Sequence, residues 1–143
     1  MKSLAIACSA ALAFLIAPAA AEEFALDGAW SERFAAANVE NGKRQFGQCR
    51  ACHTLDEGGR SMAGPNLWNV FGAASGGKSG FRYSADLKDG AIMWTPDTLD
   101  AYLKNPRSVA PKTYMAFRGV MDETKRTDLM AYIYQETRPA DGE

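Results

Sequence analysis

Apolar residues recur at helical spacing in several segments of this 143-residue chain, and no long segment alternates apolar and polar residues as a half-buried strand does. In the first such segment, Leu26, Trp30 and Phe34 follow one another at intervals of four residues, with Asp27 as a possible N-cap. This spacing predicts a short amphipathic helix. Its apolar face is expected to pack against the rest of the domain, with docking of a partner protein as the alternative.

A second helix is predicted from Val39 to about Arg50, with Asn38 as its N-cap and Phe46 on its apolar face. Gly42 lies inside this helix, where a glycine costs about 1 kcal/mol relative to alanine. The glycine therefore indicates a close contact with another helix.

The clearest helix signals lie in the second half of the chain. Thr95 is a favourable N-cap, Pro96 suits the first helical position, and Pro106 is expected to end the helix. The residues expected to face inward are Leu99, Tyr102 and Leu103.

A last helix is predicted from a cap at Thr124 to about Glu136, with its buried face formed by Leu129, Tyr132 and Ile133. Residues 54–88, in contrast, are rich in glycine and show no regular pattern. So long an irregular stretch usually depends on a further constraint such as a bound cofactor. The sequence predicts an all-α domain of three or four helices with long loops.

The N-terminus has the features of a secretory signal. Lys2 precedes an apolar run over residues 4–17, and Ala19 and Ala21 form an Ala-x-Ala site before the first acidic residues. We expect cleavage after Ala21, export to the periplasm and loss of Cys8 with the signal. An uncleaved membrane anchor is the alternative, since the run approaches the ~20 residues that span a bilayer, but its alanine richness makes a stable anchor the less favoured reading.

Removal of residues 1–21 takes away one lysine and no acid, which leaves 15 basic and 17 acidic side chains. This balance excludes the strongly basic surface typical of nucleic-acid binding. Roughly 120 mature residues suit one domain. We divide them into an extension over residues 22–37 and a main domain over residues 38–143.

The mature chain keeps two cysteines and one histidine, all within Cys49-Arg50-Ala51-Cys52-His53. A zinc site needs four ligands, and a thioredoxin-like pair needs a strand before its helix; neither is present. Cys-x-x-Cys-His is instead the attachment signature of c-type haem. It predicts one haem c, bound through thioethers to Cys49 and Cys52, with His53 as an iron ligand.

With a single histidine, a second protein ligand to the iron must be methionine or something rarer, or that position stays open. The mature methionines are 62, 93, 115, 121 and 130. Met62 is close to His53 in sequence, and Met130 follows the buried Leu129. Met115 lies about sixty residues after the histidine in an apolar loop, so its spacing is the most favourable.

The motifs CRACH, GPNLWNVFG, GFRYS, TYMAFRG and TDLMAYI occur in this order along the chain. Together they resemble the class I cytochromes c, over residues 38 to about 138. The resemblance implies the cytochrome c fold, with loops wrapped around the haem. It also implies that His53 and Met115 are the two axial ligands and that the Pro65 carbonyl accepts a hydrogen bond from the ring of His53.

Further roles follow from the same resemblance. Tyr83 and Trp94 match residues that donate hydrogen bonds to a buried haem propionate. Tyr102 matches a tyrosine near the methionine sulfur, and Phe117 matches the aromatic residue at the exposed haem edge. Gly42 and Phe46 are expected to contact Leu129 and Tyr132, where the first and last helices of the family cross.

The chain also departs from the family pattern. Ala73 stands where an arginine often compensates the propionate charge, and either Lys78 or Arg82 is an alternative source of that charge. Leu87 stands where an asparagine often joins the same network. Lysines that often surround the haem edge are largely missing, and the residues in such places are Gln48, Met62, Tyr114 and Met121. We therefore expect partner binding to depend less on salt than in a lysine-rich relative.

Two functions are compatible with these observations. The first is a periplasmic one-electron carrier, not an enzyme, that exchanges electrons with a cytochrome bc1-type complex, a terminal oxidase, a reaction centre or a periplasmic dehydrogenase, and works as a monomer. The second is a haem enzyme or gas-binding protein with an open distal site and peroxidase-like activity. His/Met ligation favours the first, because it leaves no open iron position and raises the reduction potential.

Overall fold

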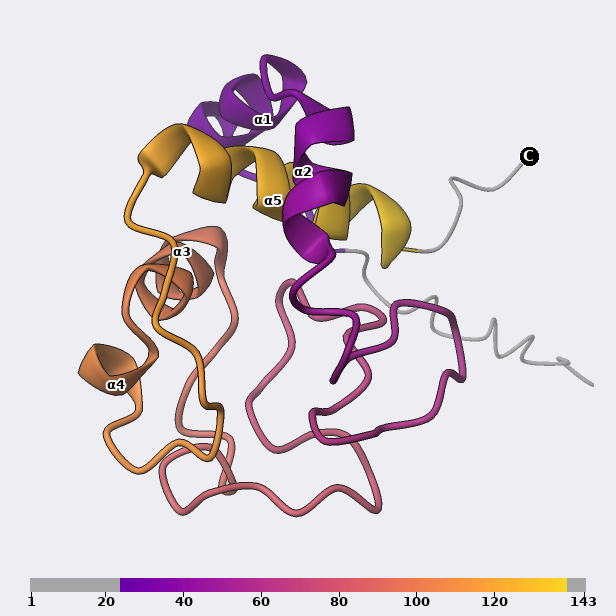
Figure 1. The fold of residues 1–143 in the computed structure, drawn as a ribbon, viewed down its shortest axis with the longest axis vertical. Coiled ribbons are helices and arrows are strands. Elements are labelled where there is room, and N and C mark those ends of the chain that lie inside the picture. The colour runs from indigo at the N-terminus through magenta and orange to yellow at the C-terminus, as the bar shows by residue number, and fades with distance from the viewer. Residues whose placement is uncertain (1–23, 139–143) are drawn as a thin grey trace, which may run out of the picture.

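The structure, a computed structural model, describes residues 24–138 (Figure 1). The expected signal peptide and its cleavage point after Ala21 lie outside these residues. The described chain forms five helices: α1 (Gly28–Ala35), α2 (Val39–Phe46), α3 (Pro96–Lys104), α4 (Pro106–Val109) and α5 (Glu123–Glu136). Between residues 24 and 138 the only β pairing is an isolated bridge between Ala74 and Met93. The expected all-α class is confirmed.

Helices α2 and α5 come from opposite ends of the chain and cross in close contact. A Cβ atom on Gly42 would lie 2.0 Å from the carbonyl oxygen of Asp128, so only glycine allows this approach. One turn further on, the rings of Phe46 and Tyr132 lie 5.7 Å apart. The buried carboxylate of Asp128 accepts hydrogen bonds from the Asn38 backbone N–H (2.8 Å) and the Asn41 amide (2.6 Å). The close helix contact predicted from Gly42 is confirmed.

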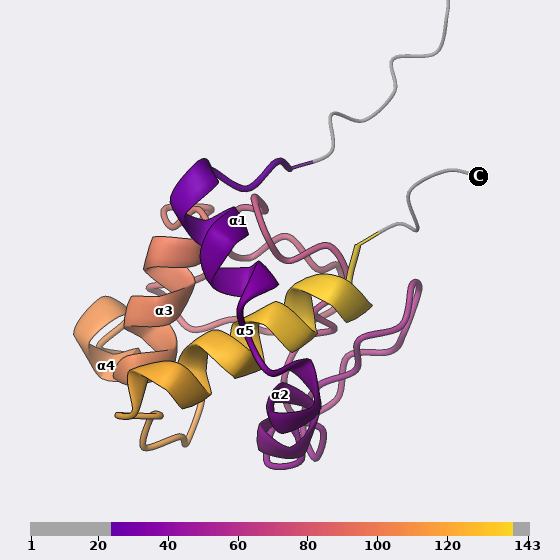
Figure 2. The same ribbon diagram turned by 90° about the horizontal axis from the view of Figure 1, so that it is seen from above.

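Helix α1 packs against α5, and Figure 2 shows α5 running across the molecule with α1 on one side and α2 on the other. Asp27 caps α1 as expected. Trp30 is buried, and its indole N–H donates to Asp97 at the start of α3 (3.0 Å). The ring of Phe34 contacts Tyr134 of α5 at a centroid distance of 5.6 Å. The apolar face of α1 is therefore used for packing within the chain.

Helix α3 begins as predicted, with the Thr95 hydroxyl accepting from the Thr98 N–H (3.3 Å) and Pro96 in the first turn. Pro106 ends α3, but it also opens the four-residue helix α4. Proline is favourable at a first helical position because its fixed φ suits the helix. An N–H group at this position would have no partner within the helix, so its absence costs nothing. The described chain thus has one helix more than the three or four expected.

Two helix boundaries differ from the prediction. The N-cap of α5 is Asp122 rather than Thr124, because the Asp122 carboxylate accepts from the Lys125 N–H (2.9 Å) and places Thr124 inside the first turn. Helix α2 ends at Phe46 rather than near Arg50. Turns continue beyond it, since the Cys49 and Arg50 N–H groups both donate to the Phe46 carbonyl.

Loops form most of the molecule below these helices (Figure 1). Arg126 of α5 ties them to α3: its guanidinium pairs with Asp100 (2.8 Å) and donates to the Val120 and Met121 carbonyls (both 3.0 Å). No helix within residues 24–138 combines the length and apolarity needed to cross a membrane.

Candidate functional site

The two cysteines lie in a tight turn directly after α2. The N–H groups of Cys52 and His53 both donate to the Cys49 carbonyl at 3.0 Å. These hydrogen bonds hold both cysteines and the histidine in one compact turn. Both thiols are free and partly buried. Burial, with a smaller effect of the neighbouring Cys52, raises the pKa of the Cys49 thiol to about 11. A redox-active pair needs a low thiol pKa, so the environment of Cys49 disfavours a thioredoxin-like role.

The imidazole of His53 is fixed by the loop that follows. Its Nδ1 lies 2.7 Å from the Pro65 carbonyl oxygen, which can only accept. The Nδ1 atom therefore carries the ring hydrogen, and Nε2 keeps a lone pair for a metal. Burial lowers the pKa of His53, although the hydrogen bond to Pro65 opposes this effect. The neutral imidazole, the form that binds metals, is favoured.

Gly64 allows the ring of His53 to lie against the backbone. A Cβ atom at position 64 would come within 2.3 Å of Cε1 of the imidazole. The next polar residue, Asn66, is buried and holds the loop in shape: its amide donates to the Thr54 hydroxyl (2.8 Å) and the Asp56 carbonyl (2.9 Å). Asn66 is a positioning residue that the sequence analysis did not single out, although it lies within the quoted GPNLWNVFG motif.

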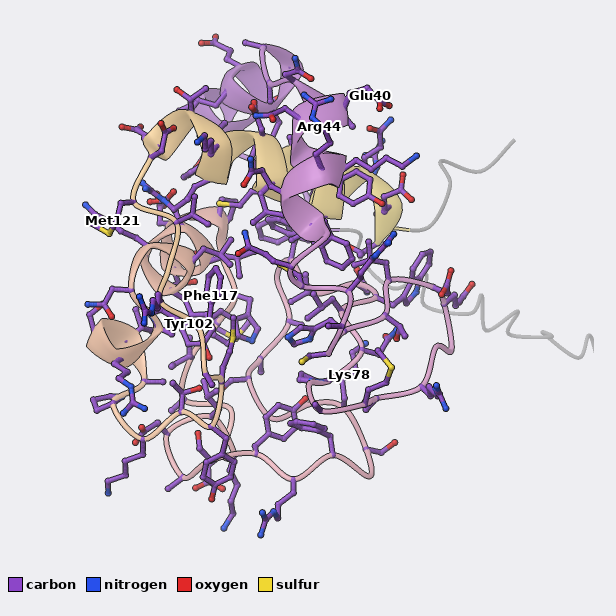
Figure 3. The ribbon with its side chains drawn as sticks, in the orientation of Figure 1. Glu40, Arg44, Lys78, Tyr102, Phe117 and Met121 are labelled. Carbon is purple, nitrogen blue, oxygen red and sulfur yellow. The ribbon has the colours of Figure 1, made fainter. Side chains whose placement is uncertain are left out.

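The loop that carries Met115 is held to α3 by hydrogen bonds. The Thr113 hydroxyl lies 2.8 Å from the buried Tyr102 hydroxyl and accepts from the Met115 N–H (3.2 Å). Burial raises the pKa of Tyr102, with the Thr113 hydrogen bond acting in the opposite direction. Figure 3 shows Tyr102 and Phe117 on the α3 side of the molecule. Thr113 is a second positioning residue that the sequence analysis did not single out, although it opens the quoted TYMAFRG motif. The identity of a threonine in an apolar loop does not show which two groups it will contact.

The environments of the methionines differ. Met93 and Met121 are exposed, at 49% and 70% of their surface. Met130 is fully buried in the core with Leu129, as expected from the α5 pattern. Met115 is partly buried in a loop whose backbone is held to α3, since the Val120 N–H donates to the Leu103 carbonyl (2.9 Å).

Three polar side chains near the 73–94 region have unused hydrogen-bonding capacity. The Tyr83 hydroxyl accepts from the Lys78 N–H (3.2 Å), which leaves its own hydrogen free to be donated. The indole N–H of Trp94 makes no hydrogen bond to another described residue, and its ring packs on Tyr102 at 5.0 Å. Ser84 is only 2% exposed, yet its buried Oγ has no partner within the described chain.

A buried hydroxyl without a partner is costly. The Ser84 hydroxyl is therefore expected to form a hydrogen bond with a polar group from outside the described chain. A haem carries two carboxylates and would supply such an acceptor. The two thiols and the oriented imidazole, which lie on one turn, suit the attachment of haem c. In residues 24–138 no cluster of three or more His, Cys, Asp or Glu side chains is arranged to hold a metal ion.

The family model described as cytochrome c matches residues 39–136. A cytochrome c homolog of Bradyrhizobium diazoefficiens is 41% identical over 68% of this chain, but the match covers only 53% of that protein, about half its length. Cytochrome c2 of Blastochloris viridis is 41% identical over 71% of this chain and 80% of its own. Cytochrome c of Dictyostelium discoideum is 41% identical over 76% of this chain and 99% of its own.

Proposed function

Because the chain belongs to the cytochrome c family, we propose that it is an exported one-electron carrier rather than an enzyme. Its haem c is attached through Cys49 and Cys52, and we assign His53 and Met115 as the axial ligands. The haem supplies a one-electron couple between Fe(II) and Fe(III). The chain supplies the ligands, excludes water from them and sets the potential.

The observation that carries this proposal is the orientation of His53. Donation from Nδ1 to the Pro65 carbonyl fixes the tautomer with Nε2 free, on the same turn as both thiols. A hydrogen bond of this kind from the other ring nitrogen both orients a histidine ligand and makes it more basic. Gly64 keeps the ring in place by its lack of a side chain.

Met115 is assigned as the second ligand from its surroundings. Thr113 ties its backbone to the Tyr102 hydroxyl, while Met93 and Met121 are directed to solvent. A thioether ligand favours Fe(II) and raises the potential. With both axial positions filled, a substrate or gas has no open site, so we prefer the carrier over the peroxidase-like alternative.

We place the protein in the periplasm, with the signal cleaved after Ala21, an extension over residues 22–37 and a main domain over residues 38–143. Its expected partners are other redox proteins, among them a cytochrome bc1-type complex, a terminal oxidase, a reaction centre or a periplasmic dehydrogenase. Electrons would pass near Phe117, which is partly buried. The neighbouring Tyr114 and Met121 are 66% and 70% exposed, so apolar contact would contribute to docking.

Haem staining, absorption spectroscopy and measurement of the midpoint potential test this proposal. The protein is expressed with its own leader in a host that attaches haem, and haem staining after denaturation reports whether attachment is covalent. We expect the weak far-red absorption band that methionine sulfur gives with ferric iron, and its loss in Met115→Ala with a lower midpoint potential. The matched controls Met62→Ala and Met121→Ala should keep both. Retention of the band in Met115→Ala would show that another residue is the ligand and that the assignment is wrong.

A further inference from the structure

One lysine near the candidate haem site is partly buried and has no acidic partner. Between residues 54 and 95 the other cations, Arg60, Arg82 and Lys88, are exposed, whereas Lys78 is partly buried. Its ammonium donates to the Trp68 carbonyl at 2.6 Å. The two ion pairs of the described chain, Arg33 with Glu123 and Arg126 with Asp100, do not include it. Burial lowers the pKa of the Lys78 ammonium, as expected where a charge loses water without gaining a counter-ion.

The residue is also next to the polar groups left without acceptors. The Lys78 backbone N–H donates to the Tyr83 hydroxyl (3.2 Å), and the unpartnered Ser84 follows Tyr83 in the chain. Figure 3 places Lys78 among the loops below α2. An ammonium group has three donors, and the Trp68 carbonyl uses one. A carboxylate would pair with a partly buried ammonium that has no acidic partner, and it would also accept from the unpartnered Ser84 hydroxyl.

We propose that Lys78 provides the positive charge that balances a haem carboxylate beside Tyr83 and Ser84, and thereby raises the reduction potential of the iron. This inference rests on the proposed function, because the carboxylate belongs to the bound haem. A negative charge near the iron stabilises Fe(III) relative to Fe(II), and a nearby cation reduces this effect. The Trp68 carbonyl holds the ammonium in place, so its charge acts from a fixed position.

The neighbouring residues do not offer the same charge. Ala73 is uncharged, and its backbone carbonyl is used by the Trp94 N–H (2.9 Å). Arg82 is exposed, and its guanidinium lies over the ring of Tyr114, 5.6 Å from the centroid. Arg82 is therefore directed toward the Met115 loop, and it makes a suitable control for a cation in the same segment.

The test compares midpoint potentials in Lys78→Gln, Lys78→Arg and Arg82→Gln at one ionic strength. Glutamine retains a donor for the Trp68 carbonyl but removes the charge, and arginine keeps the charge. We expect Lys78→Gln to lower the potential and the other two variants to stay close to wild type. An unchanged potential in Lys78→Gln, or a larger fall in Arg82→Gln, would overturn the inference.

A second variant covers the case in which Lys78→Gln folds poorly or loses haem. Adding Ala73→Arg should return a positive charge to the region from another backbone position and restore haem content and potential. Failure of this restoration counts against the role of charge. Absence of covalent haem in the wild-type protein would refute the proposed function. If haem is bound but its midpoint potential does not change when Lys78 is replaced, only the role of Lys78 is refuted.

Discussion

Thr113 joins two parts of the site through a single hydroxyl group. It contacts the buried Tyr102 hydroxyl from one side and accepts from the Met115 N–H on the other. The backbone position of Met115 thus depends on the hydroxyl group of a neighbouring side chain.

Replacing Thr113 by valine keeps the volume of the side chain and removes both hydrogen bonds. We expect a loss of about 1–3 kcal/mol in the free energy of unfolding, because the buried Tyr102 hydroxyl would lose its partner. Denaturant titration of the holo-protein measures this change. Thr113→Ser is the control and should stay close to wild type; an equal loss in both variants would show that the methyl group, not the hydroxyl, is responsible.

Features of single residues can be predicted from sequence where one local pattern is sufficient. The spacing Cys-x-x-Cys-His identifies the attachment turn, and its adjacency to α2 follows from the helix pattern before it. Thr113, Asn66 and Ser84 could not be identified in this way. Their importance comes from partners, or from a missing partner, that only the folded chain brings near.

At the scale of elements, the α2–α5 crossing is determined by one missing methyl group. Gly42 contacts the backbone of Asp128, which cannot move without shifting α5. The glycine could be interpreted from sequence because it weakens a helix that is otherwise well formed. Helix ends were predicted less well, since Asp122 and Thr124 are both good caps and the pattern does not distinguish them.

Gly42→Ala tests this contact. We expect a loss of at least about 1–3 kcal/mol in the free energy of unfolding, the usual cost of overpacking, because the new methyl would meet a backbone carbonyl. Thermal and denaturant unfolding of the holo-protein measure it. The matched control is Gly28→Ala in α1, where an added Cβ has nothing within 4 Å and the change should stay within about 1 kcal/mol. Equal effects of the two substitutions would contradict the packing explanation.

At the scale of the whole molecule, α1, α2 and α5 lie together at one end, α3 and α4 lie along one side, and loops form the rest (Figure 1). The long segment between α2 and α3 has no helix of its own and only an isolated bridge. The sequence predicted this division correctly, because glycine-rich irregular segments are visible without a structure. The small helix α4 was not predicted, since its Pro106 also reads as the end of α3.

The loop segment leads to a prediction about the protein without its cofactor. Replacing both Cys49 and Cys52 by alanine should prevent covalent retention of haem and leave a chain that largely fails to fold. The segment 54–88 has few packing partners of its own, since only Val70 and Phe71 of its large apolar side chains are buried in the core. Circular dichroism during heating measures this. A helical apo-protein that melts cooperatively would contradict the prediction, and the single variant Cys52→Ala should be intermediate in haem retention.

The packing of α1 and α5 brings the two ends of the described chain together, as Phe24 and Arg138 line the same small pocket. Figure 1 shows both ends on one side, whereas Figure 3 labels Phe117 and Met121 on the other. This arrangement fixes how the protein would orient on an electrode. Immobilisation through a tether beyond Arg138 would turn Phe117 toward the solution, where a dissolved partner can reach it. Direct exchange with the metal surface would be slow in that orientation, since the electron would have to cross the width of the protein.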